Sequence, residues 1–118
     1  MANFEGRNVS DVIDGSNGAD VISGFRGDDT LTGLGGNDAF VYSDTAFGND
    51  TILDFVAGAG TDDFLQFDDS VFANFEAVMA AATQAGNDVL ITLNGANSIR
   101  LSNVAPGSLH ANDFLFTF

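Results

Sequence analysis

The chain has 118 residues, of which 17 are acidic and three are basic, and its formal net charge at pH 7 is −14. This length fits one domain, the absence of cysteine excludes disulfides and thiolate metal sites, and the negative charge excludes nucleic acid as a favoured partner. Fifteen of the acids are aspartate, a side chain typical of turns and hard-cation sites, so bound cations would relieve the charge repulsion.

The first half of the chain repeats every nine residues. Rows 15–23, 24–32 and 33–41 follow the pattern G-x-x-G-x-D-x-U-x, where U is large and apolar, and weaker rows lie at 6–14 and 45–53. Glycines at the first and fourth places predict a tight turn with positive φ, and the last three residues predict a short strand. Stacked rows would bury the eighth-place residues Ile13, Ile22, Leu31, Phe40 and Ile52.

Nine residues make half a coil, so successive rows should lie on opposite sheets. The sixth-place aspartates then pair across alternate rows, Asp11 with Asp29, Asp20 with Asp38, and Asp29 with Asp50. Two such carboxylates repel unless a cation lies between them. Together with turn carbonyls they predict an all-oxygen cage, which suits Ca²⁺ better than Mg²⁺. A lone G-x-D is an ordinary turn, but three in phase favour metal binding.

The second half lacks the repeat. Its pattern predicts a strand at 63–67, a helix at 74–84 that Gly86 ends, two strands at 88–93 and 98–104 joined by a hairpin turn, and a last strand at 113–118. We expect this half to cover the exposed end of the stack. The predicted fold is all-β, a parallel β-roll of nonapeptide repeats (1–54) followed by a β-rich C-terminal cap (55–118) with one short helix, packed as one unit.

Catalysis finds no support in the sequence, so we expect no enzyme activity from this chain. Cysteine is absent, His110 is the only histidine and should lie at the surface, and carboxylates committed to calcium are poor acid–base groups. Among the remaining charged side chains, we expect Asp14, Asp28 and Asp44 to be solvated, and Asp68 and Asp69 to lie in a loop or cap a helix. Asp88 and Asp113 are expected at strand starts, and Arg100 should face solvent or pair with a nearby aspartate.

Residues 15–41 resemble the RTX (repeat-in-toxin) β-roll, and residues 47–67 and the tail are similar to the C-terminal cap of serralysin-type proteases and other type I-secreted bacterial proteins. In that family the carbonyls at the second and fourth places and the sixth-place aspartate are the usual calcium ligands. The resemblance implies as metal ligands Asp11, Ser16, Gly18, Asp20, Phe25, Gly27, Asp29, Leu34, Gly36, Asp38, Ala46, Gly48 and Asp50, with Asp54 and Asp62 or Asp63 at the join.

The resemblance implies a calcium-binding, calcium-folded C-terminal module of a larger secreted bacterial protein. Its partners would be calcium ions and the type I secretion machinery, and the terminal "NDFLFTF" resembles an uncleaved export signal. No apolar run approaches the roughly 18 residues of a membrane-spanning helix, and the N-terminus lacks the layout of a cleaved signal. The alternatives are a module that binds extracellular polysaccharide, the end domain of a cell-surface adhesin and, least supported, a protease.

Overall fold

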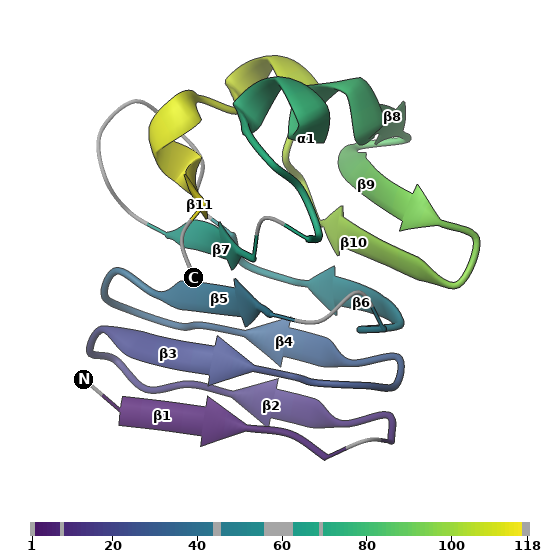
Figure 1. Cartoon of the computed structure of the whole chain (residues 1–118). Helices are drawn as coiled ribbons and strands as arrows, with labels where there is room; N and C mark the ends of the chain where they lie inside the picture. The colour runs from purple at the N-terminus through teal and green to yellow at the C-terminus, as the bar shows by residue number, and fades with distance from the viewer. Residues whose placement is uncertain (1, 8, 44–45, 56–62, 69, 117–118) are drawn as a thin grey trace.

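The computed structural model describes residues 2–7, 9–43, 46–55, 63–68 and 70–116. Two sheets face each other, and the chain passes from one to the other at every row (Figure 1). One sheet has the order β1 (Ala2–Glu5), β3 (Asp20–Ser23), β5 (Ala39–Tyr42), β7 (Phe64–Phe67) and β11 (Phe114–Phe116). The other has the order β2 (Val12–Asp14), β4 (Thr30–Thr32), β6 (Asn49–Ile52), β10 (Asn97–Leu101), β9 (Asp88–Asn94) and β8 (Ala82–Ala85).

The repeat rows form the predicted parallel roll. Strands two rows apart pair in parallel, so that Ile13 lies opposite Leu31 and Ile22 opposite Phe40. The eighth-place side chains Ile22, Leu31, Phe40 and Ile52 are at most 1% exposed, and Ile13 packs against this core from the lower end. Stacking therefore buries a continuous apolar ladder that no single three-residue strand could bury alone.

The roll extends beyond the predicted rows at both ends. Below β3, β1 pairs in parallel and adds a strand that the repeat pattern did not predict. Above β5, β7 continues the same sheet, with Leu65 fully buried opposite Phe40. This row does not fit the nine-residue frame, because Asp63 follows Asp38 by 25 residues, whereas the earlier aspartate pairs are 18 or, for Asp29 and Asp50, 21 residues apart.

The predicted helix is shorter than expected. Helix α1 spans Phe75–Ala81, with the Asn74 side chain accepting from the Ala77 N–H at its start. The prediction that it continues to residue 84 is wrong, because Ala82–Ala85 instead pairs antiparallel with β9. Gly86 has a φ of 65° and lies in the tight turn between β8 and β9, so it ends a strand and not a helix.

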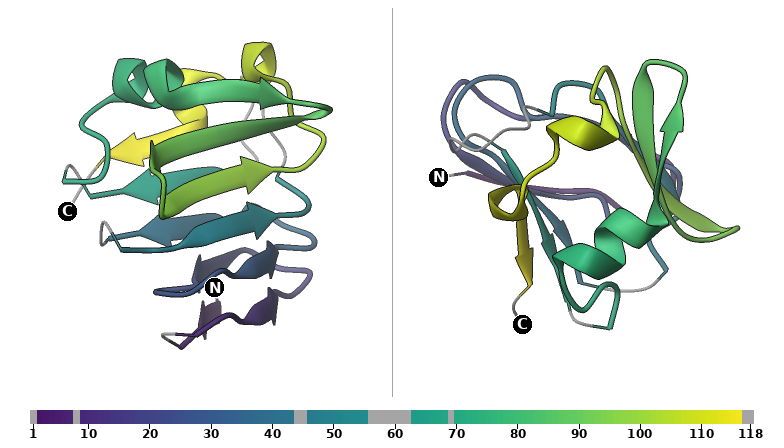
Figure 2. Two further views of the ribbon diagram at one scale, coloured as in Figure 1. Left: turned by 90° about the vertical axis from the view of Figure 1, so that its right-hand side faces the viewer. Right: turned by 90° about the horizontal axis from the view of Figure 1, so that it is seen from above.

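The C-terminal part extends both sheets of the roll. Strand β10 pairs in parallel with β6, and β11 pairs in parallel with β7, so the cap covers both upper edges as expected (Figure 2). The hairpin of β9 and β10 forms around Gly95 and Ala96. Two 3₁₀ turns, Pro106–Ser108 and Ala111–Asp113, lead into β11. No helix in the described part of the chain is long and apolar enough to cross a membrane.

Candidate metal centre

The turns that precede the strands stack in two columns along the roll. The first turn column precedes β2, β4 and β6, and the second precedes β3 and β5 and continues at Asp63, directly before β7. In Figure 1 the N-terminal rows lie at the bottom, so the row below means the next row of the same column towards the N-terminus. Within each column, Oδ1 of a sixth-place aspartate accepts the backbone N–H of the corresponding aspartate in the row below, at 2.9 or 3.0 Å. The pairs are Asp11 with Asp29, Asp29 with Asp50, Asp20 with Asp38, and Asp38 with Asp63.

The other carboxylate oxygen is buried in three of these aspartates. Oδ2 of Asp29, Asp38 and Asp50 finds no hydrogen-bond donor among the described residues, and these residues are 1%, 0% and 2% exposed. Burial raises the pKa of Asp29 and of Asp38 to about 6 and that of Asp50 to about 8, with neighbouring aspartates raising each further. Buried anionic oxygens are costly without a partner, so each calls for a cation or a proton.

Backbone oxygens converge on the same places. A Cβ built on Gly15 would lie 2.7 Å from both Asp20 Oδ2 and the Gly33 carbonyl oxygen. A Cβ on Gly6 would lie 2.7 Å from the Gly24 carbonyl oxygen and 2.8 Å from Oδ2 of its own row's aspartate. Glycine is therefore needed at the first place, because a side chain there would fill the space between the carboxylate of its own row and a backbone carbonyl of the row above in the same column.

Positive φ occurs at the second and fourth places of the turn. Gly27, Gly36 and Gly48 have φ of 96°, 79° and 81°, and Phe25 and Leu34 have φ of 62° and 65°. The prediction that first-place glycines supply positive φ is therefore wrong; their role is the close approach described above. A Cβ at Gly27, Gly36 or Gly48 would also lie 2.2–2.5 Å from backbone atoms of the row below, whereas the fourth-place Gly18 has neither positive φ nor such a close contact, so the prediction is wrong there as well.

This donor set fits a hard divalent cation. No three His, Cys, Asp or Glu side chains gather as a metal-binding group in the described part of the chain, so an ion here must be held by two carboxylates together with backbone oxygens. An all-oxygen set without nitrogen or sulfur ligands suits Ca²⁺. The columns bring together all the predicted sixth-place aspartates, and they also include Asp63, which was predicted at the join; Asp62 and Asp44 lie outside the described residues.

Three further residues connect neighbouring turns. Asp54 accepts from the Gly33 and Leu34 N–H groups at 2.8 and 2.7 Å, so both of its oxygens already have donors. Asp28 was expected to be solvated, but its Oδ1 accepts the N–H of Asn49 in the row above. At the upper end Asn97 of β10 accepts from the Gly48 N–H. Asn97 could not be identified from the repeat pattern, because its partner lies 49 residues away.

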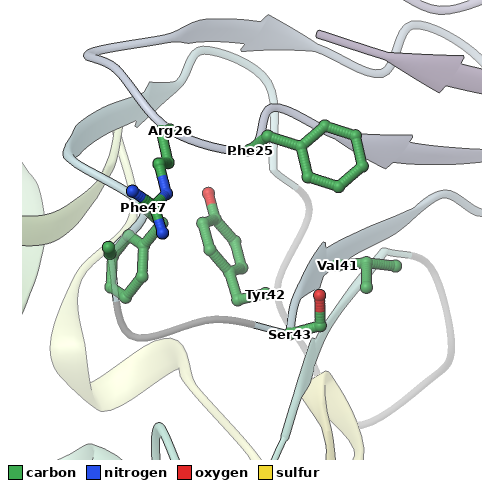
Figure 3. Close-up of a pocket in the computed structure, with 7 residues that line it drawn as sticks. Phe25, Arg26, Val41, Tyr42, Ser43 and Phe47 are labelled. Carbon is green, nitrogen blue, oxygen red and sulfur yellow. The ribbon is translucent and has the colours of Figure 1, made fainter. Parts of the chain in front are cut away.

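A small cavity lies beside the first turn column. It measures about 60 Å³ and is lined by Phe25, Arg26, Val41, Tyr42, Ser43, Ala46 and Phe47. The Tyr42 hydroxyl points between Phe25 and Arg26 (Figure 3); it makes no hydrogen bond of good geometry with the described residues, but it lies near enough to the Asp50 carboxylate to lower the pKa of that group. Burial raises the pKa of Tyr42, and Asp50 raises it further. The cavity has room for water but not for a typical organic ligand.

Comparison with known families identifies the stacked rows. The model of the RTX calcium-binding nonapeptide repeat matches four copies, over residues 5–40 and 83–102. The rows within residues 5–40 are RTX calcium-binding repeats. Repeats of this family bind Ca²⁺, in agreement with the oxygen donors of the two turn columns.

The RTX match over residues 83–102 falls on a different structure. These residues form the antiparallel strands β8, β9 and β10, not a stacked row. The aspartate of their "GND" segment, Asp88, pairs with Arg100 at 2.9 Å and accepts the Asn103 N–H at 2.8 Å. This aspartate is therefore neutralised by an arginine, and it lies in neither turn column.

The RTX roll and cap also resemble a solved structure. The crystal structure of the extracellular lipase LipA from Serratia marcescens matches with a TM-score of 0.62 and 21% identity. The match covers 98% of this chain but 21% of the lipase chain, and at this identity it shows the shared fold alone. No curated protein matches the sequence.

Proposed function

We propose that this chain is a calcium-folded module that serves the export and extracellular folding of a larger secreted bacterial protein. The observation that carries the proposal is that Asp29, Asp38 and Asp50 each have a buried Oδ2 atom without a donor among the described residues, in a stack whose rows match a calcium-binding repeat. The ligands would be the sixth-place carboxylates with carbonyls of the second and fourth places. No group of the chain is proposed to do catalysis.

Folding would then be linked to the supply of calcium. Without the ion, paired buried carboxylates repel each other and weaken the stack; with it, the free energy of binding adds to the free energy of folding. Extracellular calcium modules bind with Kd on the order of 10⁻⁴–10⁻³ M, above the calcium level inside cells. The chain would stay loose during passage through a type I exporter and would fold outside. The extracellular location of the lipase supports a secreted parent protein.

A calcium titration followed by circular dichroism tests the proposal. We expect the β signal to rise with Ca²⁺ and to respond little to equal Mg²⁺, which is smaller and keeps its waters. Asp20→Ala or Asp38→Ala should raise the calcium midpoint. Asp14→Ala is the matched control, because Asp14 is exposed at the end of β2 and belongs to neither turn column. A chain fully ordered in chelator and indifferent to calcium would contradict the proposal.

A further inference from the structure

One row of the first turn column departs from the glycine pattern. In the four rows before it, a first-place glycine stands five residues before the sixth-place aspartate, as Gly24 does before Asp29. Counted on by nine from Gly33, the next first place is Tyr42, but Asp50 follows it by eight residues. The register of β5 on β3, continued to the end of β5, places Tyr42 above Gly24. The row of Asp50 therefore has a tyrosine where the row below it has a glycine, and its aspartate comes later.

The Tyr42 side chain occupies the kind of space that a glycine leaves open in the row below. A Cβ on Gly24 would collide with Oδ2 of the aspartate in its own row. Tyr42 is nevertheless only 3% exposed, and its ring packs edge-on against Phe47, with the ring centroids 4.9 Å apart, and lies 5.8 Å from Phe67. The longer spacing between Tyr42 and Asp50 gives this side chain its room.

The phenol brings a buried hydroxyl beside a buried carboxylate. The Tyr42 hydroxyl and Asp50 Oδ2 are both buried, and neither makes a hydrogen bond of good geometry with the described residues. Burial raises the pKa of Asp50, and the Tyr42 hydroxyl is near enough to oppose that rise. Oδ1 of Asp50 already accepts the Asp29 N–H at 2.9 Å, so Oδ2 is the oxygen left for the hydroxyl. A carboxylate oxygen has two lone pairs, so Oδ2 can accept this bond and still bind a cation.

We propose that Tyr42 is a positioning residue for Asp50: its hydroxyl donates to Oδ2 and holds this oxygen towards an ion bound between Asp29 and Asp50. This inference rests on the proposed calcium function, because it concerns one of the proposed sites. Oδ2 of Asp29 and of Asp38 has no donor in the described part of the chain, and glycine stands at the first place of their rows. The Asp50 site is thus preorganised by a side chain that the repeat pattern lacks. Hydrogen bonds to ligating carboxylates of this kind raise the affinity for the metal.

Terbium luminescence tests whether a bound ion lies beside Tyr42. Tb³⁺ replaces Ca²⁺ at oxygen ligands and emits when a nearby excited aromatic side chain transfers energy to it, and this transfer falls steeply with distance. Tyr42 is the only tyrosine and the chain has no tryptophan, so excitation of tyrosine selects this one side chain. We expect Tb³⁺ emission that added Ca²⁺ displaces. Asp50→Asn should remove most of this emission, whereas Asp38→Asn, which changes the other column, should leave most of it.

Calcium titrations followed by calorimetry test the role of the hydroxyl itself. Tyr42→Phe keeps the ring that packs against Phe47 and Phe67 and removes only the hydroxyl. It should weaken calcium binding at the Asp50 site by about threefold to tenfold, the equivalent of one hydrogen bond. In an Asp50→Asn background the same change should have no further effect, because the charged ligand that the hydroxyl supports is already gone. In the matched Asp38→Asn background the full effect should remain.

The outcomes separate this inference from the proposed function. A wild-type chain that ignores both Ca²⁺ and Tb³⁺ overturns the two together. If the wild type binds calcium but Tyr42→Phe binds it equally tightly, or loses the same affinity in both backgrounds, the inference alone is overturned, because the tyrosine then contributes packing only. Circular dichroism in saturating calcium should match the wild type and show that Tyr42→Phe folds. If this variant does not fold, the Tb³⁺ emission decides: emission that survives Asp50→Asn overturns the inference, and emission that only Asp50→Asn removes supports it.

Discussion

Replacing Asp38 by asparagine should have opposite effects with and without calcium. Asparagine keeps the shape of the side chain and an oxygen that accepts the Asp20 N–H, the 3.0 Å bond that links the two rows. It removes the negative charge from an Oδ2 that is buried and has no donor among the described residues. The metal-free fold loses a repulsive charge, whereas the calcium-bound fold loses a ligand.

The size of the first effect follows from the pKa of Asp38. Burial raises this pKa from 3.8 to about 6, and each unit corresponds to about 1.4 kcal/mol, so the ionised carboxylate costs the metal-free fold at most about 3 kcal/mol. Solvent near the turn screens part of this cost, and the new amide nitrogen needs an acceptor. We therefore expect Asp38→Asn to raise the free energy of unfolding in chelator at pH 8 by about 1–2 kcal/mol.

The second effect should appear in the calcium titration. Because calcium affinity depends on the number of charged ligands, Asp38→Asn should raise the midpoint by about tenfold. The folded fraction in chelator, followed by circular dichroism, measures the first effect and the calcium titration measures the second, with Asp14→Asn as the exposed control. A variant that is less stable than the wild type in chelator, or one that keeps the wild-type midpoint, would refute the reasoning that Asp38 is a destabilising charge reserved for a cation.

Three other predictions concern pH, backbone approach and ion choice. In chelator the three buried sixth-place aspartates hold protons more tightly in the folded chain, with pKa values of about 6, 6 and 8, than in the unfolded chain, so the free energy of unfolding should fall as pH rises from about 4 to 8. A β signal that instead grows over that range in chelator would contradict this assignment. Gly48→Ala should destabilise the calcium-bound fold by more than about 2 kcal/mol in thermal unfolding, because its φ is 81° and a Cβ would lie 2.2 Å from a carbonyl oxygen of the row below. Gly95→Ala, where a Cβ meets nothing within 4 Å, should cost far less, and equal costs would argue against the close approach. Millimolar Mg²⁺ should leave the thermal midpoint close to its chelator value, whereas equal Ca²⁺ should raise it.

The repeat made the roll predictable from the sequence. A nine-residue spacing places each eighth-place residue and each sixth-place aspartate in register, so the buried ladder and the paired aspartates followed from counting alone. Counting also explains what was missed. The aspartate before β7 is out of phase with the repeat and β1 has no repeat signature, so neither strand could be recognised as part of the stack.

Local propensity was less informative in the C-terminal half. An alanine-rich segment predicted a helix up to residue 84, but the strand β9 pairs with Ala82–Ala85 and hydrogen bonding to it outweighs the helical preference of alanine. Pairing between distant strands also decides which residues reach the turn columns. The role of Asn97 depends on β10 lying beside β6, so it could not be found from spacing within one row.

The alternation of rows between two sheets limits how the length of this roll can change. In each ladder contact a sixth-place aspartate is hydrogen-bonded to one that lies 18, 21 or 25 residues further along the chain. Removing one row of nine would transfer every later strand to the opposite sheet and would detach β10 and β11 from the strands that they cover. Removing 18 residues keeps each strand on its own side, so in evolution and in engineering the roll should gain or lose rows in pairs.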